Sequence, residues 1–74
     1  MRLPAVTGQE VLQALKRAGF VPLRQKGSHI YIRHPDGRST VIPVHKGSDI
    51  DRGLLRKIIK DAELEKDEFI NLLR

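Results

Sequence analysis

The chain has 74 residues, of which 39% are hydrophobic, and a formal net charge of +5. This length suits a single domain over residues 1–74 with one small core. Cysteine is absent, which excludes disulfides and thiolate metal sites. The sequence contains no long apolar run of the kind that would predict a signal peptide or a membrane span. We therefore expect a cytoplasmic protein.

Positive charge is concentrated in the first part of the chain. Residues 1–60 contain twelve Lys and Arg against four Asp and Glu, whereas residues 61–74 contain two against five. A basic body with an acidic tail predicts an anionic partner for the body. The charge alone favours nucleic acid only slightly over a soluble basic surface without a specific partner.

A helix is predicted over residues 8–18. Thr7 and Glu10 have the spacing of a capping box, in which each side chain accepts a hydrogen bond from the other residue's backbone N–H. Apolar residues then recur at helical spacing: Val11, Leu12, Leu15 and Ala18. Gly19 should end the helix, because glycine readily takes the positive φ of a C-cap position.

Three strands are predicted next, at residues 20–25, 29–33 and 39–44, separated by short turns. Consecutive strands with short turns form an antiparallel meander, which commonly buries one face and leaves the other in solvent. Pro43 cannot donate a ladder hydrogen bond, so the third strand should be an edge strand.

Two helices complete the chain. The first is expected to begin near Ser48 or Asp49 and to end near Ala62, with an apolar stripe of Leu54, Leu55, Ile58, Ile59 and Ala62. A short helix near residues 65–73 should bury Phe69, Leu72 and Leu73. The order α-β-β-β-α plus a short C-terminal helix predicts an α+β fold with the helices on one face of the sheet, which resembles the double-stranded RNA-binding domain.

The turn Pro35-Asp36-Gly37 predicts the register of the second hairpin. A three-residue loop with Gly37 in the left-handed region pairs His34 with Arg38, and therefore His29 with Pro43. Ile30 and Ile32 then face the helices, while His29, Tyr31 and Arg33 occupy the open face. His45 becomes the diagonal neighbour of His29, with their backbones roughly 7–8 Å apart.

His29 is the main candidate for chemistry, since it follows Gly27-Ser28 and lies among cations. Free histidine titrates near neutral pH, so it can transfer the protons that cleavage of RNA through the 2′-hydroxyl requires. The alternative is a surface histidine after an ordinary turn. His45 is a candidate for the second proton transfer or for holding the phosphate, or it only orders the following loop. The candidate RNA contacts are Arg24, Lys26, Ser28, Tyr31, Arg33 and Lys46.

Two other kinds of site are disfavoured. A metal site lacks ligands at suitable spacing, because His29 and His34 should point to opposite faces of the sheet. A basic stripe on the predicted second helix favours a solvent-exposed helix face over a binding site; it consists of Arg52, Arg56 and Lys60. Asp49 and Asp51 at the start of that helix would repel a phosphate, which argues against ordinary duplex binding.

Taken together, these residues resemble the HicA family of toxins, also called YcfA-like proteins, from about Thr7 to Leu73. The marks of the resemblance are Gly19-Phe20, Gly27-Ser28-His29, Pro43-Val44-His45, the helix Leu55-Arg56-Lys57-Ile58-Ile59 and the tail Glu68-Phe69. Relatives tend to have Ala-Gly at the end of the long second helix, where this chain has Ala62-Glu63.

The resemblance implies a metal-independent mRNA endonuclease without a cofactor, whose catalytic histidine corresponds to His29. It also implies a HicB-type antitoxin that covers the active face. Two alternatives remain open: a non-catalytic module that blocks translation by occupying RNA, and a basic face that serves mainly an acidic protein partner.

Overall fold

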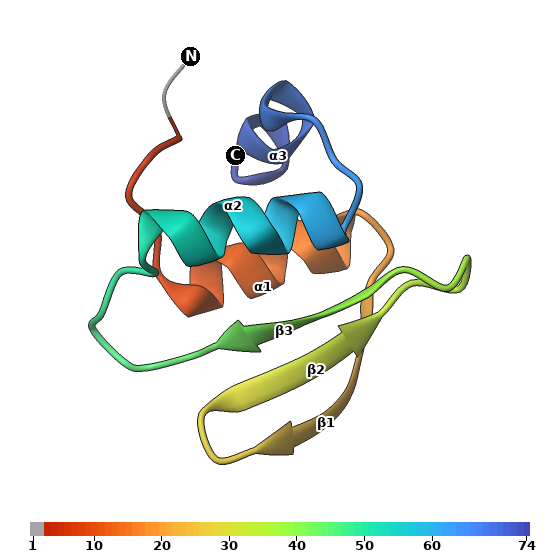
Figure 1. The fold of residues 1–74 in the computed structure, drawn as a ribbon, viewed down its shortest axis with the longest axis horizontal. Coiled ribbons are helices and arrows are strands. Elements are labelled where there is room, and N and C mark those ends of the chain that lie inside the picture. The colour runs from red at the N-terminus through yellow and green to blue at the C-terminus, as the bar shows by residue number, and fades with distance from the viewer. Residues whose placement is uncertain (1–2) are drawn as a thin grey trace.

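The computed structural model describes residues 3–74. Its elements in chain order are α1 (Gly8–Arg17), β1 (Val21–Lys26), β2 (His29–Arg33), β3 (Ser39–Pro43), α2 (Arg52–Asp61) and α3 (Lys66–Leu72). The strands form one antiparallel sheet in the order β1-β2-β3. Helices α1 and α2 pack on one side of the sheet, and α3 lies on the side of these helices away from the strands (Figure 1). The predicted α+β fold and element order are confirmed.

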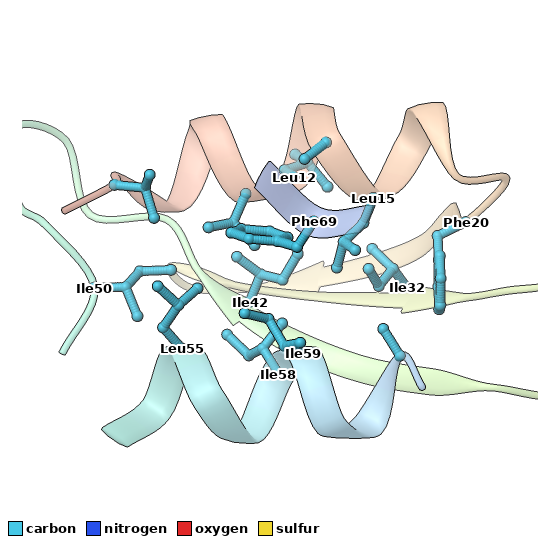
Figure 2. Close-up of a cluster of buried hydrophobic side chains, with 14 of the residues drawn as sticks. Leu12, Leu15, Phe20, Ile32, Ile42, Ile50, Leu55, Ile58, Ile59 and Phe69 are labelled. Atoms are coloured by element: carbon cyan, nitrogen blue, oxygen red, sulfur yellow. The ribbon is translucent and has the colours of Figure 1, made fainter. Parts of the chain in front are cut away.

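The core lies between the two long helices and the sheet, and Figure 2 shows its side chains converging from both helices. Alternation along β2 supplies one part of it, because Ile30 and Ile32 face the helices and are 8% and 1% exposed. The short helix α3 contributes Phe69, which is fully buried. The helix α3 therefore contributes to the same core as α1, α2 and the sheet.

The predicted register of the second hairpin is confirmed. His29 pairs with Pro43 and Ile30 with Ile42, and His34 N donates to Arg38 O over 2.7 Å. Gly37 takes the left-handed conformation, with φ of 102°, that the three-residue turn requires. The turn and the apolar alternation thus specify which side chains share the open face.

The first helix begins and ends close to the predicted residues. Thr7 Oγ1 accepts from Glu10 N over 3.2 Å, while Thr7 N donates to Glu10 Oε1 over 2.9 Å, which completes the capping box. At the other end Ala18 is the C-cap and Gly19 has a φ of 102°. The helix itself ends at Arg17, one residue earlier than expected.

The predicted start of α2 at Ser48 or Asp49 is wrong, because the helix begins at Arg52. The preceding segment instead pairs with the N-terminal segment: Ile50 N donates to Val6 O over 2.8 Å, and Asp49 forms an antiparallel bridge with Thr7. Asp51 then caps the helix by accepting from Gly53 N over 3.0 Å. Burial of Ile50 in the core keeps this segment extended.

Strand β1 is the edge strand farthest from the helices (Figure 1), and all six of its residues are exposed. It begins one residue later than expected, because Phe20 enters the core with 2% exposure. A bulge at Leu23 shifts the pairing with β2 between Pro22 and Arg24. Pro22 and the bulge break the row of hydrogen-bonding groups along this edge, which hinders another strand from pairing with it.

The remaining differences concern element ends and three apolar side chains, since Leu72 and Leu73 are half-buried rather than buried. Strand β3 ends at Pro43 rather than at residue 44, and α3 is one residue shorter at each end than residues 65–73. Leu54 was expected in the apolar stripe of α2, yet it is 37% exposed on the side of the helix near β3.

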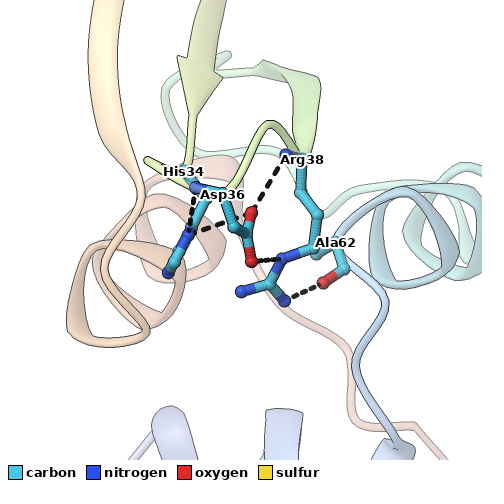
Figure 3. Close-up of polar contacts among 4 residues, drawn as sticks. All are labelled: His34, Asp36, Arg38 and Ala62. Atoms are coloured by element: carbon cyan, nitrogen blue, oxygen red, sulfur yellow. Dashed lines mark hydrogen bonds and ion pairs between the residues drawn. The ribbon is translucent and has the colours of Figure 1, made fainter.

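His34 belongs to a structural network at the tip of the second hairpin (Figure 3). Its Nδ1 accepts from Asp36 N over 3.1 Å, and its ring meets Phe20 edge-on at 5.2 Å between centroids. Arg38 donates to Asp36 Oδ2 over 2.8 Å and to Ala62 O over 2.5 Å. These bonds tie the hairpin to the C-terminal end of α2.

Candidate active site on the open face of the sheet

His29 is exposed at the first position of β2, and because it alternates with the buried Ile30 and Ile32 it lies on the face of the sheet away from the helices. Its two cross-strand partners are Lys26 on β1 and Pro43 on β3. Directly opposite residues share a face of the sheet, so the lysine and the imidazole project to the same side. An anion held near this histidine would therefore meet a positive charge.

His45 lies close to His29, as the register predicted. The two rings are 6.4 Å apart between centroids, with an angle of 81° between their planes. Ser28 Oγ lies 3.3 Å from His45 Nε2, within hydrogen-bond distance. One backbone bond continues the pairing past the end of β3, since Val44 N donates to Ser28 O over 2.6 Å. This bond holds the residue before His45 against the residue before His29.

A groove starts at His29 and runs over the open face to the edge of β3 and onto α2. Arg24 is stacked on its floor, with its guanidinium carbon 4.7 Å from the centroid of the half-buried Tyr31 ring. The lining includes the following side chains: Leu23, Arg24, His29, Tyr31, Arg33, Val41, Leu54 and Lys57. An aromatic ring and aliphatic side chains between cations suit a strand of nucleotides, whose bases stack and whose phosphates are anionic.

The other predicted RNA contacts lie at the two ends of this groove. Lys26, Ser28 and Lys46 flank the histidine end, and Lys46 is exposed in the loop that follows His45. Arg33 lies at the opposite end of β2, roughly 13 Å from His29 at about 3.3 Å per residue. Arg33 therefore lies at the end of β2 away from His29.

Among the groove side chains named above, the sequence did not predict four: Leu23, Val41, Leu54 and Lys57. Val41 could have been found, because it is the direct partner of Tyr31 in the predicted register. The two α2 residues depend on how the helix packs along β3. No pattern within the sequence indicates that packing angle.

Lys57 is held by an ion pair at the α2 side of the groove. Its Nζ lies 2.9 Å from Asp61 Oδ2, which also accepts from Thr40 Oγ1 over 3.0 Å. The hydrogen bond from Lys57 lowers the pKa of Asp61, and the bond from Thr40 adds to this effect. The carboxylate is thereby kept ionised and partly neutralises the charge of Lys57.

Two charged groups at the start of α2 have partners within the chain. Arg52, from the predicted basic stripe, donates to Leu3 O over 2.5 Å and so anchors the N-terminal segment. Asp51 occupies the helix N-terminus as its cap. Among residues 3–74, no three His, Asp or Glu side chains gather as metal ligands would. Within the same part of the chain, no helix combines the length and apolarity that crossing a bilayer requires.

A family model described as the HicA toxin of bacterial toxin–antitoxin systems matches residues 8–64. The match runs from the first turn of α1 to the segment between α2 and α3, so it includes the sheet, both histidines and the groove. A comparison with curated proteins gives no match.

Proposed function

Because the chain belongs to the HicA toxin family, we propose that it is the toxin of a type II toxin–antitoxin pair and acts as an endoribonuclease on mRNA. His29 is its central proton-transfer residue. The observation that carries the proposal is the position of this histidine, exposed opposite Lys26 at the end of a groove with an aromatic floor and cationic sides.

The chemistry requires no group from outside the chain. An imidazole removes the proton of a 2′-hydroxyl, the freed oxygen attacks the neighbouring phosphorus, and the bond from phosphorus to the 5′-oxygen breaks. Such proton transfer contributes about 10²–10⁴-fold to a rate. Lys26 is placed to stabilise the negative charge that develops on the phosphate, while Arg24 and Tyr31 hold the strand in the groove.

Membership of a toxin family implies an antitoxin partner. We propose a HicB-type protein that covers the open face, since that face presents exposed aliphatic side chains at Val21 and Leu23 beside several cations. A partner with acidic groups around an apolar centre would mask the groove from RNA. The toxin would act in the cytoplasm, where its mRNA substrate is translated.

The proposal is tested with purified protein and end-labelled mRNA. Wild-type protein should cut the RNA, and His29→Ala should cut at least 100-fold more slowly with an unchanged midpoint of thermal unfolding. His34→Asn is the matched control: it replaces a histidine of the same hairpin that faces the core, and it should cleave at the wild-type rate below its unfolding temperature.

Three outcomes would contradict the proposal. Full cleavage by His29→Ala would remove that residue from the reaction. RNA that is retarded on a native gel yet stays whole would indicate a module that acts by occupancy. EDTA should leave cleavage unchanged, and a loss of activity on chelation would point to a metal mechanism instead.

A further inference from the structure

We propose that His45 is the general acid of the cleavage reaction and that Ser28 positions it, an inference that rests on the proposed cleavage at His29. The observations are the 6.4 Å separation of the two imidazole rings and the 3.3 Å contact between Ser28 Oγ and His45 Nε2. Both histidines are exposed, so a substrate can reach them together.

The backbone holds this arrangement from two sides. The bond from Val44 N to Ser28 O extends the β2–β3 pairing to the residue before His45. On the other side, α1 begins directly against Pro43 and Val44, since a Cβ added at Gly8 would lie 2.0 Å from Pro43 O. His45 therefore follows a segment fixed by the sheet and by a helix, although it lies outside regular secondary structure itself.

The separation of the rings fits two-sided proton transfer at one phosphate. Each histidine must come within about 2.6–3.2 Å of an oxygen on opposite sides of the phosphorus, so the reacting nitrogens must lie roughly 6–9 Å apart. Rings 6.4 Å apart and nearly perpendicular meet this requirement with small side-chain rotations. The structure thus places two imidazoles at the spacing that one phosphodiester needs.

The hydrogen bond to Ser28 leaves one nitrogen of His45 free to act as the acid. A protonated imidazole has an N–H donor on each nitrogen. Ser28 Oγ can accept from Nε2, while Nδ1 of His45 makes no hydrogen bond with any of residues 3–74. Nδ1 is the nitrogen that remains to donate to a leaving oxygen. His29, which lines the groove where the strand lies, is left as the base.

The reaction balances without another reactant. His29 accepts the proton of the 2′-hydroxyl as the 2′-oxygen forms a bond to phosphorus. The bond from phosphorus to the 5′-oxygen breaks, and His45 gives its proton to that oxygen. The products are a 2′,3′-cyclic phosphate and a 5′-hydroxyl end, and proton exchange with water restores both histidines.

A substrate with a sulfur leaving group tests the assignment. An RNA that the wild-type protein cuts is prepared with sulfur in place of the 5′-bridging oxygen at the mapped site, because a thiolate leaves without being protonated. His45→Ala should slow cleavage of the normal linkage by about 10²–10⁴-fold and cut the sulfur linkage at nearly the wild-type rate. Ser28→Ala should show a smaller loss that the sulfur linkage also restores.

His29→Ala is the comparison, since a missing base should slow cleavage of both linkages. If alanine disturbs the loop, His45→Gln tests the same role, because its amide can still form a hydrogen bond to Ser28 but cannot donate a proton to the leaving oxygen. Wild-type rates for both His45 variants on the normal linkage would overturn this inference and leave the role of His29 intact. Equal losses on both linkages would also overturn it, because they would indicate that His45 binds the phosphate. No cleavage by the wild-type protein would overturn the proposed function, and this inference with it.

Discussion

Gly8 and Pro43 are in direct backbone contact, at the point where the first turn of α1 meets the end of β3. A Cβ on Gly8 would lie 2.0 Å from the carbonyl oxygen of Pro43 and 2.9 Å from Val44 Cα. No side chain fits there, so this glycine is required by close approach rather than by an unusual φ. The contact sets the position of the chain immediately before His45.

Gly8→Ala should therefore lower both stability and activity. The methyl group forces α1 and β3 apart, which we expect to reduce the free energy of unfolding by about 2–3 kcal/mol and to displace His45. Chemical denaturation and RNA cleavage measure the two effects. Gln9→Ala, at the exposed next position, is the control and should change neither. A wild-type unfolding curve for Gly8→Ala would show that the contact is looser than described.

Tyr31 should contribute to RNA binding through its ring rather than its hydroxyl. Stacking of a base on an aromatic side chain is worth about 1–3 kcal/mol, so Tyr31→Leu should weaken binding of single-stranded RNA by roughly 5- to 150-fold. Tyr31→Phe keeps the ring that Arg24 covers and should bind like the wild type. Fluorescence anisotropy with a labelled oligonucleotide, in the background of His29→Ala, measures affinity without cleavage. Equal affinity for the two Tyr31 variants would exclude stacking.

Glu63 should be a site where one substitution stabilises the protein. It has a φ of 55°, in the left-handed region, directly after the C-cap of α2. A non-glycine residue is strained there, so Glu63→Gly should raise the free energy of unfolding by about 0.5–1 kcal/mol. Glu63→Ala retains the Cβ and should bring no such gain, and an equal gain from both variants would attribute the effect to the lost charge.

Acid should remove the contribution of Asp61 to stability. Hydrogen bonds from Lys57 and Thr40 lower the pKa of Asp61 in the folded protein from its ordinary value of 3.8. Because the pKa of Asp61 is lower in the folded protein than in the unfolded chain, its ionised form stabilises the fold at every pH above the unfolded pKa. That contribution is lost as the pH falls through the folded pKa.

Asp61→Asn should consequently be less stable than the wild type at neutral pH and equally stable in acid below both values. Thermal unfolding from pH 7 to pH 2 measures the difference. Asp49→Asn is the control, because the Asp49 side chain forms no ion pair or hydrogen bond within residues 3–74. If the difference in thermal stability between Asp61→Asn and the wild type stays constant with pH, it does not come from ionisation of Asp61.

Much of the site could be predicted because it depends on local signals. The turn Pro35-Asp36-Gly37 and the alternation in β2 specify a register, and the register alone places His29 opposite Pro43 with Tyr31 on the same face. Diagonal pairing then brings His45 near, as the ring separation of 6.4 Å confirms. The roles proposed for these residues in catalysis and RNA binding remain predictions.

The start of α2 shows where local signals were insufficient. Ser48, Asp49 and Asp51 are all residues that cap helices well, and the nearest neighbours of each do not distinguish among them. The choice depends on Ile50, which is buried beside the N-terminal segment and bonded to Val6 O. That partner lies more than forty residues away in the chain.

By itself, the sequence determined the order of elements, the hairpin register and the face that carries the imidazoles, because periodicity and turn chemistry act between residues close along the chain. Only the tertiary structure decided that Ser28 meets His45, that α1 abuts Pro43 and that Leu54 and Lys57 extend the groove. The contact between Ser28 and His45 depends on how the chain continues past β3, and the other two depend on the angle and depth at which helices pack on the sheet. Packing of the whole core sets these quantities, and no short pattern of residues encodes them.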